Sequence, residues 1–199
     1  LMVPQIVQAV NAACDRYQKV HGYMRNLDEV AIHMRCGDVL GLKHHKEYGY
    51  MGISSYLKVI PKDVKSIGII TAGKGRNKDS RHLGKCTAIM HGFRAALMKA
   101  YPAAAISIHN TDTIMKSYIR LANASVATIC NPSTFCLYPT LAAENRGYLV
   151  GSPLYPWVER ITNGEKRVHI IKGAKRITPT DIVGKQMSGM QISEWIRKN

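Results

Sequence analysis

Apolar residues recur along the chain at two spacings, which predict a regular succession of helices and strands. Apolar positions three and four apart over residues 3–20 predict an amphipathic helix. Short, continuous apolar runs predict buried strands at 30–34, 66–71, 104–108, 126–130 and 148–150. Helical spacing returns between these runs at 52–60, 83–100, 112–123 and 134–143.

This order of elements predicts an α/β fold. Each strand is followed by a crossover long enough to bring the chain back for a parallel strand. The strands are apolar throughout rather than alternating, which favours a sheet covered by helices on both faces. We therefore expect a Rossmann-like domain over 1–153.

The regular alternation of predicted strands and helices ends at Pro153. We expect a C-terminal extension over 154–199 that packs on this domain. Within it, 168–171 could form one more strand. Thr178-Pro179-Thr180-Asp181 is typical of a capping box and predicts the start of a helix running, with a break at 188–189, to Trp195.

The chain is strongly basic, with 28 Lys and Arg against 13 Asp and Glu and a formal charge of +15 over 199 residues. This charge implies an anionic partner: nucleic acid, a nucleotide-activated substrate, an acidic glycan or a membrane surface. A hydrophobic content of 46% excludes disorder along the whole chain. No apolar run approaches the roughly 18 to 20 residues of a membrane-spanning helix, and the start Leu1-Met2-Val3-Pro4 lacks a secretory pattern.

The five cysteines are odd in number and contain no C-x-x-C pair. This pattern argues against a zinc ribbon and against a disulfide framework. It predicts reduced, mostly buried thiols and weakly favours a reducing compartment, although the localisation stays open.

In open parallel sheets, ligands bind at the carboxyl ends of the strands. The first such loop carries His33, Arg35 and Asp38, and Gly37 permits a close backbone approach. The planar fork of an arginine suits a phosphate, but an Arg35–Asp38 salt bridge closing a turn explains the pattern equally well.

Two further loops carry polar side chains at strand ends. Ser133 and Thr134 stand between a strand and a helix, where backbone N–H groups and hydroxyls can bind an anion, unless Ser133 is only a helix cap. The stretch 109–113 is either a plain helix cap or a polar group that contacts a base or ribose. The chain has no complete G-x-G-x-x-G, no P-loop, no G-x-S-x-G and no D-x-D metal motif.

Together these loops resemble a known family. His33-x-Arg35-x-Gly37-Asp38 is similar to the H-x-R-R-x-D signature of the α-1,2-, α-1,6- and protein O-fucosyltransferases, with Cys36 in place of the second arginine. The segment 130–135 resembles their later serine-threonine-phenylalanine turn, and 109–112 stands where those enzymes carry an acidic turn. Tyr48-Gly49-Tyr50 is similar to an element of related algal and viral glycosyltransferases.

The resemblance implies a GT-B glycosyltransferase, of which this chain would be mostly the C-terminal donor-binding domain, with the acceptor domain absent or reduced. The donor would be a GDP-fucose-like nucleotide sugar or a UDP-sugar such as UDP-xylose, held without a metal or other cofactor, and the acceptor a glycan or protein. The implied catalytic residues are Arg35, His33 and Asp38. The implied donor-binding residues are Arg35, Asn110, Asp112, Ser133, Thr134, Phe135, Thr71 and Gly73.

Within that set, the resemblance implies that Arg35 binds the β-phosphate of the donor and that His33 contacts the nucleotide or the sugar. Two alternatives stay open. A basic nucleic-acid-binding module would explain the charge, but only two Phe and two Trp are present and no RNA- or DNA-binding motif is recognisable. A glycan-binding remnant without turnover is the other.

Overall fold

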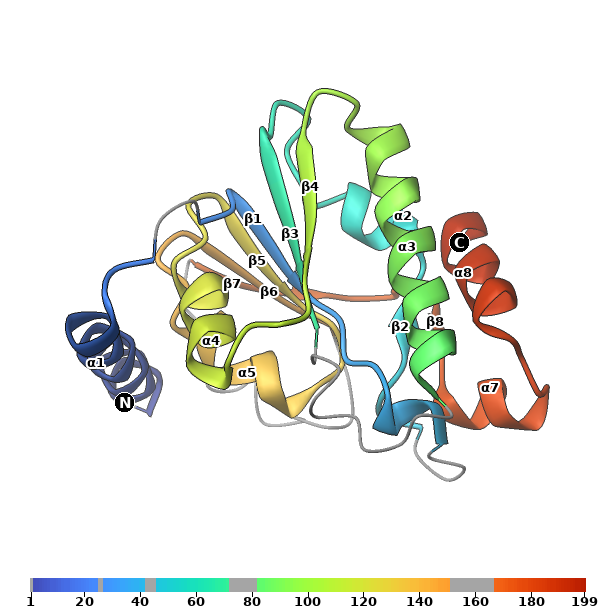
Figure 1. Cartoon of the computed structure of the whole chain (residues 1–199), viewed down its shortest axis with the longest axis horizontal. Coiled ribbons are helices and arrows are strands. Elements are labelled where there is room, and N and C mark those ends of the chain that lie inside the picture. The colour runs from blue at the N-terminus through green and yellow to red at the C-terminus, as the bar shows by residue number, and fades with distance from the viewer. Residues whose placement is uncertain (1, 25–26, 42–45, 72–81, 151–166) are drawn as a thin grey trace.

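The computed structural model describes residues 2–24, 27–41, 46–71, 82–150 and 167–199 (Figure 1). Its centre is a six-stranded parallel sheet, with helices on both faces. The α/β, Rossmann-like prediction is therefore confirmed. The strands are β1 (Val30–His33), β3 (Ser66–Ile70), β4 (Ala105–His109), β5 (Ala127–Cys130), β6 (Arg146–Val150) and β7 (Val168–Ile171).

The strands lie side by side in the order β4-β3-β1-β5-β6-β7. Counted along the chain, this is the order 3-2-1-4-5-6 of dinucleotide-binding folds. The order reverses between β1 and β5, and the carboxyl ends of strands at such a switch point are where ligands bind in this architecture. The register places His33 beside both Ile70 and Cys130, so the ends of β1, β3 and β5 lie level.

Two helical layers cover the sheet. On one face lie α4 (Ile114–Ala122) and α5 (Thr134–Leu141), with α1 (Met2–His21) packed against both. On the other lie α2 (Ile53–Leu57) and α3 (Leu83–Ala100), and α8 (Gly189–Lys198) packs against α3. Alternate residues of β1 supply the two cores: Val30 and Ile32 face the α3 side, and Ala31 the α5 side.

The C-terminal residues join this assembly. Strand β7 pairs with β6 in the main sheet, and β8 (Arg176–Ile177) pairs with β2 (Tyr50–Met51) as a separate antiparallel ribbon. The predicted capping box is present: Thr178 Oγ1 accepts from the Asp181 N–H at 3.2 Å, and the Asp181 carboxylate accepts from the Thr178 N–H at 3.0 Å. It opens α7 (Pro179–Gly184). The ribbon and the short helix η1 (Asp38–Gly41) were not predicted, because each is too short to leave a periodic pattern.

The prediction of reduced cysteines is wrong, because the fold brings four of them together as two pairs. Cys36 and Cys86 are 50 residues apart in sequence, yet their Cα atoms lie 5.7 Å apart and they form a disulfide. Cys130 and Cys136 form a second, and Cys14 is a buried free thiol. The argument for a reducing compartment rested on reduced thiols and loses its basis. Within the described ranges, no helix combines the length and apolarity needed to cross a membrane.

The two disulfides are expected to differ in their contribution to stability. Cross-linking constrains the unfolded chain more strongly when the closed loop is longer. Replacing both cysteines of the Cys36–Cys86 pair by alanine should lower the free energy of unfolding by about 4 kcal/mol, against about 2 kcal/mol for the Cys130–Cys136 pair. Urea unfolding of the two double variants measures the difference. A larger loss from the Cys130–Cys136 pair would contradict this expectation.

Candidate functional site

Two of the predicted loops, those after β1 and β5, meet at the switch point of the sheet. His33 ends β1, and the loop that carries Arg35 follows it. Asn131 and Ser133 follow the end of β5, the neighbouring strand. The ladder continues one residue past the strands, because the N–H of Met34 donates to the Ile70 carbonyl at 2.9 Å. Arg35 and Ser133 therefore lie on adjacent strand tips at the same edge of the sheet.

His33 is buried, with 4% of its surface exposed, and stacks on Phe135 with ring centroids 5.0 Å apart. Phe135 also meets Tyr118 edge-on at 5.1 Å. Burial, followed by the charge of Arg35, lowers the pKa of His33 to about 3. The imidazole is therefore neutral at physiological pH and offers one donor and one acceptor nitrogen.

Arg35 lies in a loop that is held at several points. Its guanidinium carbon sits 4.5 Å from the centre of the Tyr48 ring, a cation–π contact. Cys36 ties the loop to α3 through the disulfide, and the Tyr50 hydroxyl donates to Cys36 Sγ at 3.2 Å. Gly37 has a φ of 91°, a conformation that favours glycine. Asp38 then opens η1, and the position of its side chain lies outside the described structure.

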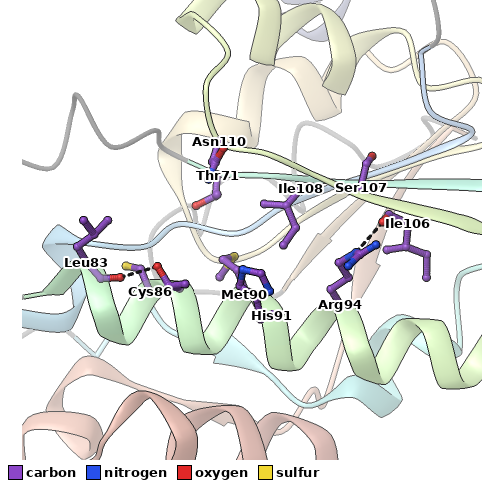
Figure 2. A pocket seen from close by; sticks show the side chains of 11 residues that line it. Thr71, Leu83, Cys86, Met90, His91, Arg94, Ile106, Ser107, Ile108 and Asn110 are labelled. Carbon is purple, nitrogen blue, oxygen red and sulfur yellow. Dashed lines mark hydrogen bonds between the residues drawn. The ribbon is translucent and has the colours of Figure 1, made fainter.

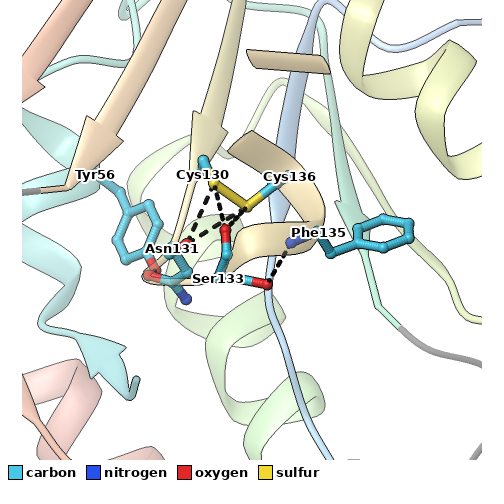
Figure 3. Close-up of a disulfide and its surroundings, with 6 residues drawn as sticks. All are labelled: Tyr56, Cys130, Asn131, Ser133, Phe135 and Cys136. Atoms are coloured by element: carbon cyan, nitrogen blue, oxygen red, sulfur yellow. Dashed lines mark hydrogen bonds between the residues drawn. A yellow bond between two sulfur atoms is a disulfide. The ribbon is translucent and has the colours of Figure 1, made fainter. Parts of the chain in front are cut away.

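The start of α5 presents donors to the same edge. Ser133 caps the helix by accepting from the Phe135 N–H at 3.3 Å. The carbonyl oxygens of Asn131 and Ser133 face the Cys130–Cys136 sulfurs, at 3.3 to 3.6 Å (Figure 3). Disulfide sulfurs carry no proton, so these are contacts rather than hydrogen bonds. The N-terminus of α5 carries a partial positive charge, which suits an anion.

Three buried polar atoms at this edge lack a hydrogen-bond partner among the described residues. They are His33 Nδ1, Thr71 Oγ1 and Asn131 Nδ2, on residues that end or follow β1, β3 and β5. Leaving one such group unpaired costs about 1–3 kcal/mol. Unpaired groups on three adjacent strand tips indicate a site built to receive a polar ligand.

A cleft of about 400 Å³ lies between α3 and the β3–β4 side of the sheet (Figure 2). Thr71 and Asn110, both predicted site residues, lie together at its carboxyl-end rim. Ile108 and Met90 supply apolar walls, and Arg94 lies further along, where its Nε donates to the Ile106 carbonyl at 2.8 Å. The cleft therefore combines apolar walls with polar groups at one end.

Asp112 has a different environment. Its carboxylate accepts from Arg120 Nε at 2.6 Å, and Arg120 also lies 3.5 Å from Asp28. Asp28 in turn contacts His109 Nε2 at 2.9 Å. These four largely buried charged or titratable groups tie α4 to the sheet, so the structure places Asp112 in a supporting network, while Asn110 lines the cleft.

The arrangement around His109 does not match a serine hydrolase triad. Ser107 Oγ and Asp28 both contact the same nitrogen, Nε2, whereas a triad uses both ring nitrogens. Gly68 provides the room for this network, since a Cβ there would lie 2.2 Å from an Asp28 oxygen.

Of the remaining predicted residues, Ser133 is fully buried and Thr134 is exposed. Gly73 lies outside the described residues. The described ranges contain no group of three His, Cys, Asp or Glu side chains arranged to hold a metal ion. Asn131, whose Nδ2 is one of the three unpaired atoms, was not among the predicted site residues, although its position between the strand and Pro132 was an available signal. No protein-family model, curated protein or solved structure matches this chain.

The burial of His33 predicts a pH-dependent stability. With a folded pKa of about 3 against an ordinary 6.5, the unfolded chain binds a proton that the folded chain does not between these values. Stability should therefore fall as pH drops below 6.5, by up to about 1.4 kcal/mol per pH unit from this group. Urea unfolding from pH 7.5 to 4.5 should show a shallower decline in His33→Phe, which keeps the ring but cannot titrate. Identical slopes would rule out this role for His33.

Proposed function

We propose that this chain is the donor-binding domain of a GT-B glycosyltransferase. It would move a sugar from a nucleotide diphosphate sugar to a glycan or protein acceptor, without requiring a metal. The observation that carries the proposal is the set of unpaired polar atoms of His33, Thr71 and Asn131 at the switch point, beside Arg35 and the start of α5. The resemblance of the same loops to fucosyltransferase motifs supports it independently of the coordinates.

In this proposal the diphosphate lies over the tips of β1 and β5. Arg35 approaches it from the first loop, and Ser133 with the N–H groups of α5 from the second. An arginine can donate two parallel hydrogen bonds to phosphate oxygens. The partial positive charge at the helix N-terminus adds to this attraction.

The chemistry follows from where charge develops. When the bond between the sugar and the β-phosphate breaks, negative charge grows on that phosphate as it leaves. Fixed donors that already point at this position stabilise the transition state more than the ground state. Each disulfide holds one of the two loops, Cys36–Cys86 the first and Cys130–Cys136 the second, so the donors need little rearrangement.

The base would occupy the cleft along α3. Thr71 and Asn110 offer hydrogen bonds at its rim, and Ile108 offers apolar contact to the base. Because Asp112 forms an ion pair with Arg120, Asn110 rather than Asp112 would hydrogen-bond the base or the ribose. His33, neutral at physiological pH, would hydrogen-bond a hydroxyl of the sugar or nucleotide.

The direct test is nucleotide binding. GDP and UDP, titrated separately by calorimetry, should show binding of at least one, and the matching sugar nucleotides should then be hydrolysed or transferred. Binding of oligonucleotides that collapses with added salt, with no response to either nucleotide, would favour the nucleic-acid-binding alternative instead.

Arg35→Ala should weaken nucleotide binding by about 10- to 100-fold, because a charge-assisted hydrogen bond is lost. It should reduce the rate of sugar transfer or hydrolysis by about 10²–10³. Arg35→Lys should fall between, since an ammonium cannot donate in a planar fork. Arg146→Ala, an exposed arginine at the opposite, amino end of β6, is the matched control and should match the wild type. Equal binding and turnover in Arg35→Ala would remove it from the mechanism.

A further inference from the structure

The side chain of Asn131 is fixed in one orientation at the tip of β5. Its residue is 1% exposed. Its Oδ1 accepts a hydrogen bond from the Tyr56 hydroxyl at 2.6 Å (Figure 3). Its Nδ2 has no partner among the described residues. One end of the amide is therefore held, while the other is left to donate.

Tyr56 determines which end is held. It is fully buried on α2, where it packs against Phe93 with ring centroids 4.8 Å apart. Burial raises the pKa of its hydroxyl well above the ordinary range, so the proton stays in place. That proton needs an acceptor, and Asn131 Oδ1 is the acceptor it has. The amide nitrogen must then lie on the opposite side.

The amide nitrogen stands beside a second hydrogen-bond donor. The carbonyl oxygens of Asn131 and Ser133 face the disulfide. Ser133 accepts from the Phe135 N–H and keeps its own proton to donate. Figure 3 shows the Asn131 nitrogen and the Ser133 hydroxyl beyond the end of β5. An amide NH₂ only donates, so the ligand must bring a hydrogen-bond acceptor, and the oxygens of a diphosphate are strong acceptors.

We propose that Asn131 is a further donor-binding residue, whose Nδ2 donates to an oxygen of the nucleotide diphosphate, and that Tyr56 positions it. This inference rests on the proposed function. It extends the anion site from two contributors, Arg35 and the start of α5, to a third that the sequence motifs do not mark.

The test compares nucleotide affinity with stability. Asn131→Ala should weaken binding of GDP or UDP, whichever the wild type binds, by about 10- to 100-fold in calorimetry. Asn131→Asp keeps the acceptor for Tyr56 but replaces the donor by a negative oxygen, so it should lose at least as much. Thr140→Val is the matched control. This variant lacks the Thr140 hydroxyl, which is fully buried and has no partner among the described residues. Because Thr140 lies on α5, away from the strand tips, the variant should bind nucleotide as the wild type does.

Tyr56→Phe should weaken binding by about threefold to tenfold, because the amide is no longer held in one orientation. Combined with Asn131→Ala it should add nothing further, which identifies a positioning role. Thermal unfolding checks that each variant is folded. If Asn131→Ala does not fold, the nucleotide affinities of Tyr56→Phe and Asn131→Asp test the role of Asn131 in its place.

The outcomes separate the two proposals. If the wild type binds neither nucleotide, the proposed function fails and this inference fails with it. If the wild type binds but the Asn131 variants bind equally well and lose only stability, the proposed function stands and the assignment of Asn131 is wrong. Additive losses in the double variant would overturn the positioning role of Tyr56.

Discussion

The pairing of β1 with β5 is the constraint on which the site depends. These strands are separated by nearly a hundred residues, whose described part includes β2, α2, β3, α3, β4 and α4, yet they are neighbours in the sheet. Their register brings His33 level with Cys130, and so places the loop of Arg35 beside the start of α5. The proposed diphosphate site uses this juxtaposition, because it takes donors from both loops.

Each of these loops is tied to the framework by a disulfide. Cys36–Cys86 joins the first loop to α3, and Cys130–Cys136 joins the end of β5 to α5. The stacking of Arg35 on Tyr48 and of His33 on Phe135 adds side-chain order at the same edge. Such preorganisation suits a reaction in which charge develops at one place, because donors fixed in advance need no reorganisation when it appears.

The polar groups at the strand tips contrast with those behind them. Asp28, His109, Arg120 and Asp112 satisfy one another in a network on the α4 face. At the tips, His33, Thr71 and Asn131 each retain an unpaired atom. A folded chain minimises such costs in its structural regions and tolerates them where a ligand completes the bonding. Thr140 on α5 also has a hydroxyl without a partner among the described residues, so a single unpaired atom does not mark a site. The grouping of three such atoms at one edge distinguishes the strand tips, which we propose bind the donor, from the Asp112–Arg120 network, which supports the fold.

The sequence by itself determined the helices, the strands of the main sheet and the edge at which polar loops gather, because apolar periodicity and the parallel crossover rule act over short stretches of chain. It also identified Arg35, His33 and Ser133 as strand-end residues. The tertiary structure alone decided the disulfides, the ion pair between Asp112 and Arg120 and the hydrogen bond from Tyr56 to Asn131. Cys36–Cys86 and Tyr56–Asn131 join residues 50 and 75 apart in sequence. Cys130–Cys136 and Asp112–Arg120 are closer in sequence, but each joins two different elements or the loops beside them. Whether any of these contacts forms depends on strand order, register and packing, none of which leaves a local pattern.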